Sequence, residues 1–115
     1  MNAQYLESVG RLSRVAGVRG ALLVDADAGV AVVSELREGV NETAVAALAA
    51  SLFRRTGDAS RMADFGRLHT LQLEADGGHV VAVDAGELIL VVVTDHDAQL
   101  GVVRYEAHRA AESLS

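Results

Sequence analysis

The segment Asn41–Phe65 constrains the fold of this chain most strongly, because its pattern predicts a single long helix. Asn41 stands where an N-cap side chain accepts a hydrogen bond from an orphan backbone N–H. Val40 and Val45 have the spacing of a hydrophobic staple across that N-terminus. Gly66 follows the last predicted turn, and glycine takes the left-handed conformation of a C′ residue at little cost.

The predicted helix has three faces when its residues are placed about 100° apart. One stripe, which we expect to lie on a sheet, comprises Val45, Leu48, Leu52, Thr56, Ala59 and Ala63, with Ala49 beside it. A second stripe of mostly small residues comprises Ala46, Ala50, Phe53 and Gly57. A polar face comprises Thr43, Ala47, Ser51, Arg54, Asp58 and Arg61. A surface helix needs only one apolar stripe, so the second predicts contact with the same helix of another subunit. The alternative is that alanine is present only as a good helix former.

Length and composition indicate one domain, residues 1–115, with an aliphatic core. Half of the residues are hydrophobic, but only 3% are aromatic. Cysteine is absent, which excludes disulfides and thiolate metal sites and is compatible with the cytoplasm. The N-terminus lacks the pattern of a signal peptide, and the apolar runs are too short to span a bilayer. We therefore expect a cytoplasmic protein without membrane insertion.

The charge pattern excludes two classes of function. The net charge is −6, and all ten basic residues are arginine. Binding to nucleic acid is disfavoured, because phosphate contacts require a basic face. A P-loop requires a lysine, so the chain is not expected to be a P-loop nucleotide hydrolase.

The remaining pattern predicts two more helices and five strands. The helices are residues 3–15, capped by Asn2, and 98–113, capped by Asp95 or Asp97; the strands are 21–26, 30–34, 67–75, 79–84 and 87–94. The order is α-β-β-α-β-β-β-α. Hairpins and one helical crossover join these strands into one mostly antiparallel sheet. The long helix is expected on one face and the terminal helices on the other, a three-layer α/β sandwich.

Three segments of this pattern resemble the roadblock / dynein light chain family, and in particular its bacterial single-domain members of the MglB type. They are residues 20–29 (GALLVDADAG), 86–94 (GELILVVVT) and 97–104 (DAQLGVVR). The resemblance covers nearly the whole chain, but it consists of packing and turn patterns rather than catalytic signatures. Ala28 and Gln99 depart from residues that are frequent in the family.

The resemblance implies a profilin-like fold and a homodimer, with the long helices antiparallel and the 67–75 strands joined edge to edge. The expected dimer interface comprises Ala46, Ala50, Phe53, Gly57, Leu68, His69, Thr70, Leu71, Gln72 and Leu73. Relatives act as platforms for Ras-like small GTPases or as adaptors in motor and membrane-trafficking assemblies. Some MglB-type members accelerate GTP hydrolysis without donating a catalytic residue.

No motif in the sequence predicts catalysis, a metal or a cofactor. The segment Asp25–Gly29 fails the EF-hand pattern and is typical of a β-turn. The four histidines form no metal-binding pair, and neither a G-x-S-x-G elbow nor a G-x-G-x-x-G loop is present. Arginine fingers are one interpretation of Arg54, Arg55 and Arg61. We favour contact residues instead, since arginine is enriched in interfaces. The expected partner-binding residues are Ser51, Arg54, Arg55, Asp58 and Arg61.

Three functions remain open at this point. The first is a homodimeric scaffold that binds and regulates a Ras-like GTPase. The second is a structural adaptor in an assembly that contains no GTPase, and the third is a small-ligand sensor. Fold alone does not decide among them. A GTPase encoded next door favours the first, and a ligand that copurifies favours the third.

Overall fold

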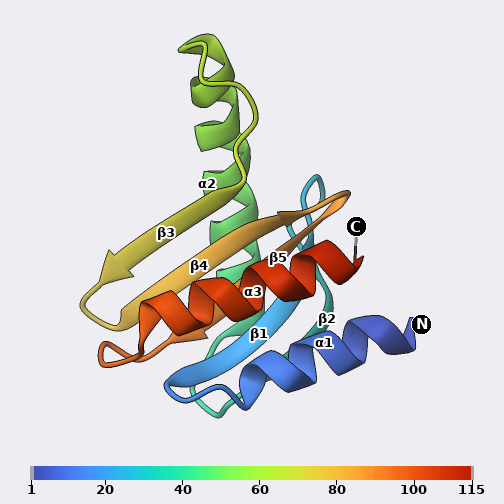
Figure 1. Ribbon diagram of the computed structural model, residues 1–115, viewed down its shortest axis with the longest axis vertical. Helices are drawn as coiled ribbons and strands as arrows, with labels where there is room; N and C mark the ends of the chain where they lie inside the picture. The colour runs from blue at the N-terminus through green and yellow to red at the C-terminus, as the bar shows by residue number, and fades with distance from the viewer. Residues whose placement is uncertain (1, 115) are drawn as a thin grey trace.

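The computed structural model describes residues 2–114 (Figure 1). Its elements are α1 (Ala3–Ser13), β1 (Val18–Asp25), β2 (Ala31–Leu36), α2 (Glu42–Met62), β3 (Thr70–Ala75), β4 (Gly78–Ala85), β5 (Leu88–Thr94) and α3 (Leu100–Leu114). The predicted order of helices and strands is confirmed. Most predicted bounds are displaced by one to three residues, as is usual for element ends.

The five strands form one sheet in the order β2-β1-β5-β4-β3, and all neighbouring pairs are antiparallel. Strand β5 lies in the middle, and six of its seven residues are buried. This confirms the interpretation of the nearly continuous apolar run as a central strand covered on both faces. Strands β2 and β3 are the two edges of the sheet.

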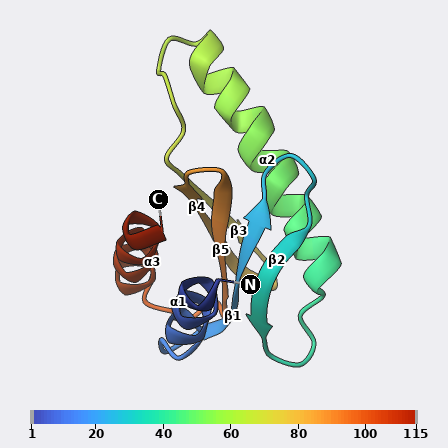
Figure 2. The ribbon, with the colours of Figure 1, turned by 90° about the vertical axis from the view of Figure 1, so that its right-hand side faces the viewer.

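The sheet is the middle of three layers, as expected. Figure 2 shows α2 on one face and both α1 and α3 on the other. Successive residues of a strand point to opposite faces, so Leu22 packs in the cluster beneath α2, while Leu23 packs in the cluster beneath α1 and α3. Both side chains are fully buried.

The two ends of α2 are formed differently. At the N-terminus the predicted cap is confirmed, because the Asn41 side chain accepts from the Ala44 backbone N–H at 3.0 Å. At the C-terminus the prediction of Gly66 as C′ is wrong, since the helix ends at Met62. Asp64 takes the left-handed conformation, with φ 66°, and Phe65 N–H donates to the Ser60 carbonyl at 2.9 Å. This is a Schellman motif, and aspartate is among the few residues besides glycine that tolerate its C′ position.

The structure corrects part of the assignment of the two apolar stripes predicted for α2. Val45 and Ala49 of the first stripe pack in the cluster beneath the helix, as predicted. Ala46 and Ala50 of the second stripe are buried in the same cluster, and Phe53 packs against it, half-buried. Gly57 is buried beside Leu68 of the connection that follows α2. By contrast, Leu48 is 43% exposed although it was predicted to face the sheet. The physical reason is the small size of the alanine side chains, which lets the helix backbone approach the sheet closely. The assignment of Ala46, Ala50 and Gly57 to a contact between subunits is therefore corrected.

Strand β3 is shorter than predicted, because it begins at Thr70 rather than Arg67. The C-terminal part of α2 extends beyond the edge of the sheet, and the chain returns from it in an irregular connection (Figures 1 and 2). Leu68 and His69 belong to that connection and not to the edge strand. The His69 carbonyl nevertheless accepts a hydrogen bond from Asp84 N–H at 3.0 Å, which continues the ladder with β4.

The cap predicted for α3 is also wrong. The helix begins at Leu100, so Gln99 directly precedes it, and neither Asp95 nor Asp97 is at the N-cap position. Asp95 instead directly follows β5, where its backbone N–H donates to the Gly17 carbonyl at 2.8 Å.

Candidate functional site

The structure separates the five residues predicted to bind a partner. Arg54, Asp58 and Arg61 line one cleft at the C-terminal half of α2. Arg55 is exposed but does not line this cleft, and Ser51 is half-buried outside it. On a helix with 100° per residue, Arg55 lies about 100° around the axis from Arg54. The predicted partner-binding set is thus divided between one flank of α2 and its outer surface.

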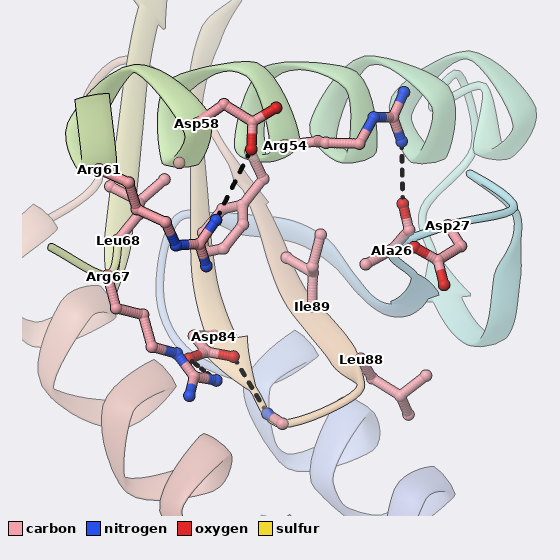
Figure 3. A pocket seen from close by; sticks show the side chains of 13 residues that line it. Ala26, Asp27, Arg54, Asp58, Arg61, Arg67, Leu68, Asp84, Leu88 and Ile89 are labelled. Carbon is pink, nitrogen blue, oxygen red and sulfur yellow. Dashed lines mark hydrogen bonds and ion pairs between the residues drawn. The ribbon is translucent and has the colours of Figure 1, made fainter.

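The cleft lies where α2 passes over the turns at one end of the sheet (Figure 3). Its lining consists of Ala26, Asp27, Phe53, Arg54, Gly57, Asp58, Arg61, Arg67, Leu68, Asp84, Gly86, Leu88 and Ile89. Its lining combines apolar side chains, which we call the floor, with charged side chains, which we call the rim. The volume is about 210 Å³, below the roughly 300–1,000 Å³ typical of pockets that enclose drug-sized ligands. The cleft is therefore suited to receive part of a larger partner.

Each of the three arginines in the cleft has a different anchor (Figure 3). Arg54 Nη1 donates to the Ala26 carbonyl, across to the β1–β2 turn, at 3.1 Å. Arg61 Nη1 lies 3.6 Å from Asp58 Oδ1, one helical turn away on the same helix. Arg67 Nη2 lies 2.6 Å from Asp84 Oδ2.

The Arg67–Asp84 ion pair is the most firmly held of these contacts. The Asp84 side chain is only 15% exposed, and its Oδ1 also accepts from Gly86 N–H at 3.1 Å. Charge-assisted hydrogen bonds of this kind are shorter and stronger than neutral ones. Both partners of the Arg61–Asp58 pair are mostly exposed, so that pair contributes little. Sequence reasoning missed Arg67, because its partner is distant in the sequence and no motif marks the pair.

A second exposed surface lies on the opposite flank of α2 and along β3. Leu52 and Thr56 lie roughly 160° around the helix axis from Arg54 and Asp58, respectively. Leu48 is 43% exposed and Met62 86% exposed. Contiguous exposed apolar area on a small protein commonly marks an interaction site. We call Leu48, Leu52, Ala59 and Met62 the apolar flank of α2.

Strand β3 presents an open edge next to this flank. Among residues 2–114, no strand pairs with the side of β3 that faces away from β4. His69 and Asp84 are opposite each other and bonded, and bonded pairs alternate along an antiparallel ladder. The backbone N–H and C=O groups of Thr70, Gln72 and Glu74 therefore point to the open edge. The Thr70 and Gln72 side chains lie on the α3 face, where they contact His108 and Arg104, each at 3.0 Å.

Within residues 2–114, no group of three or more His, Asp or Glu side chains is arranged to hold a metal ion. In the same part of the chain, no helix has the combination of length and apolar character needed to cross a bilayer.

The chain is thus a small α/β domain whose long helix α2 has a charged cleft on one flank and exposed apolar residues on the other. The profile of the Roadblock/LC7 domain matches residues 5–94. The chain belongs to the Roadblock/LC7 domain family, as the sequence resemblance predicted. A curated relative, an uncharacterized protein of Methanocaldococcus jannaschii, is 34% identical over 103 residues, which are 90% of each chain.

Solved structures of MglB proteins are similar to this chain. The gliding protein MglB from Thermus thermophilus superposes with a TM-score of 0.84 at 25% identity, over 99% of this chain and 90% of that one. Myxococcus xanthus MglB superposes with a TM-score of 0.86 at 22% identity, over 97% of this chain and 92% of that one. These similarities confirm the MglB-like fold.

Proposed function

We propose that the protein is a non-catalytic homodimeric scaffold that binds and regulates a Ras-like small GTPase. The observation that carries the proposal is the division of α2 into two exposed surfaces of different chemistry. The apolar flank adjoins the open edge of β3, and the other flank carries Arg54, Asp58 and Arg61. An apolar surface beside an unpaired strand suits a permanent contact with a second copy. A polar, arginine-bearing surface suits a partner that binds and leaves.

In this proposal the apolar flank replaces Ala46, Ala50 and Gly57 as the helical part of the dimer interface. The α2 helices of two subunits pack antiparallel through Leu48, Leu52, Ala59 and Met62. Thr70, Leu71, Gln72 and Leu73 keep their expected place in the interface as part of the open edge. Leu71 and Leu73 are half-buried and lie on the α2 face of the sheet, so they adjoin the helical contact.

The outward-pointing backbone groups also suggest a register for the two β3 strands. A two-fold axis at Gln72 pairs Gln72 with Gln72 of the partner subunit. It also pairs Thr70 with Glu74 of the partner subunit. All three residues of β3 whose backbone groups point outward then find partners, which removes an edge prone to aggregation.

The GTPase docks, in this proposal, on the solvent side of α2, over Ser51, Arg54, Arg55, Asp58 and Arg61. Arg54, Arg55, Asp58 and Arg61 are exposed, and they stand on a long helix that packs on a five-stranded sheet. Rigid elements position contacts better than loops do. The family resemblance supplies the class of the partner. A surface that fits the switch loops of one nucleotide state favours that state by linkage, and we propose the GTP state.

The test measures binding to the purified Ras-like GTPases of the source organism by isothermal titration calorimetry. Each GTPase is loaded with GDP or with a non-hydrolysable GTP analogue. At least one of them should bind, and the GTP-analogue form should bind at least about tenfold more tightly, about 1.4 kcal/mol. If none binds in either state while the protein remains dimeric, the structural adaptor becomes the better description.

A further inference from the structure

We infer that the cleft beside Arg54 receives an acidic side chain and the aliphatic side chain two positions after it, both from an extended segment of the partner. This inference rests on the proposed function, because it names the chemistry of the contact that a docked partner makes. It adds Arg67, Leu68 and Leu88 to the surface. It also assigns Arg54 a role that Arg55 does not share.

Arg54 is the arginine of the cleft whose charge is not matched. Within residues 2–114, its guanidinium donates to the Ala26 carbonyl and has no carboxylate within ion-pair distance. Arg61 and Arg67 each have an aspartate beside them. The bond to Ala26 orients the guanidinium and leaves most of its five N–H donors free. A carboxylate matches such a planar fork in a bidentate manner.

The apolar lining of the cleft indicates which second group the ligand needs besides the carboxylate. The same cleft is lined by apolar surface from Phe53, Leu68, Leu88 and Ile89. Burying that surface requires an aliphatic group on the ligand, since area removed from water contributes roughly 25 cal/mol per Å². In an extended segment, alternate side chains share one face, so an acidic residue two positions before leucine, isoleucine or valine satisfies both parts of the cleft.

The carboxylates in the cleft disfavour a phosphate as the occupant. Asp27, Asp58 and Asp84 all line it, and Asp27 is exposed on the β1–β2 turn. A dianion meets more repulsion from these groups than a single carboxylate does. It also leaves the apolar floor uncovered. The geometry thus points to a peptide carboxylate, and inorganic phosphate becomes a control in the test.

The probe is a capped peptide, acetyl-Gly-Asp-Leu-Leu-Gly-amide, titrated into the ¹⁵N-labelled protein. Its matched control carries Asn in place of Asp, and inorganic phosphate is titrated separately. The Nε–Hε signal of Arg54 and the backbone signals of Leu68 and Leu88 should shift with the Asp peptide. The Asn peptide should bind at least about fivefold more weakly, because it loses the charge-assisted pair.

Two adjacent arginines give a matched pair of variants. Arg54→Gln should weaken binding of the Asp peptide by about fivefold or more, while Arg55→Gln, with the same loss of charge, should change it by less than about twofold. Asp27→Asn should strengthen binding by about twofold, because it removes a like charge from the rim. Unchanged backbone signals from residues far from the cleft verify that each variant is folded.

The inference fails if Arg55→Gln weakens peptide binding as much as Arg54→Gln does, or if the Asn peptide binds as tightly as the Asp peptide. It also fails if phosphate shifts the same signals with equal or higher affinity. Each of these failures can be distinguished from a failure of the proposed function. A GTPase that binds wild type and Arg54→Gln equally well supports the scaffold and overturns the role of the cleft.

Discussion

Arg67 and Asp84 lie 2.6 Å apart and tie the connection after α2 to strand β4. The pair stands at one wall of the cleft, and Asp84 also accepts the Gly86 backbone N–H. Through this one carboxylate, the loop that returns from the end of α2 is fixed to the β4–β5 turn. Leu68, the residue after Arg67, lines the same cleft.

Replacing Asp84 should therefore cost more stability than replacing an exposed aspartate of the same cleft. We expect Asp84→Asn to lower the free energy of unfolding by about 1–2 kcal/mol. This is the contribution of a charge-assisted hydrogen bond, reduced because the Arg67 side chain is exposed to solvent. Asp58→Asn is the control, and it should cost less than about 0.5 kcal/mol because both members of its pair are exposed. Urea denaturation measures both values. Equal losses would contradict the structural role assigned to Asp84.

Leu48 is exposed and Ala50 is buried, so we expect different outcomes for a charge inserted at each position. Leu48→Arg places a charge on the apolar flank, so the subunit should stay folded and sediment as a monomer at micromolar concentration. Ala50 is 1% exposed against the sheet, so Ala50→Arg should prevent folding, because a buried unpaired charge costs several kcal/mol. Sedimentation velocity and circular dichroism distinguish the two results. A folded, dimeric Leu48→Arg protein would exclude the proposed helical contact.

Proline substitutions test which backbone groups of β3 point outward. The N–H of Gln72 faces the open edge, so Gln72→Pro should leave the subunit folded and weaken dimerisation by about tenfold, the loss of two symmetric hydrogen bonds. The N–H of Leu71 faces β4, so Leu71→Pro should instead destabilise the subunit. Gln72→Ala controls for the lost side-chain contact with Arg104. If Gln72→Pro unfolds the subunit and Leu71→Pro does not, the alternation is assigned to the wrong residues.

Much of the fold is predictable from the sequence, because turns and periodicity are local signals. Asp27-Ala28-Gly29 and the cap at Asn41 fix where elements begin and end. The run 87–94 is apolar on both faces, which identifies the central strand. These features require no knowledge of distant residues.

The orientation of α2 and the set of residues that line the cleft cannot be predicted from local sequence patterns. Ala50 and Leu48 are both apolar, and the rotation of α2 about its own axis decides which one faces the sheet. The Arg67–Asp84 pair joins residues 17 positions apart. It depends on how far α2 extends before the chain returns, and the assignment of Gly66 as C′ made the predicted helix too long. Sequence reasoning therefore found Arg54, Asp58 and Arg61 but not their surroundings.

The central claim is that a GTPase docks on the solvent side of α2. The most direct measurement compares two double charge reversals, each verified to remain dimeric, in their binding to the GTP-analogue form of the GTPase. Arg54→Glu with Arg61→Glu alters the proposed docking face. Arg11→Glu with Arg109→Glu alters the opposite face, where Arg11 pairs with Glu7 and Arg109 lies over the Tyr105 ring.

The account predicts that the first double variant raises Kd by roughly tenfold or more, about 1.4 kcal/mol, and that the second changes it by less than about twofold. Unchanged binding for Arg54→Glu with Arg61→Glu, together with lost binding for Arg11→Glu with Arg109→Glu, would contradict it and move the docking site to the face covered by α1 and α3.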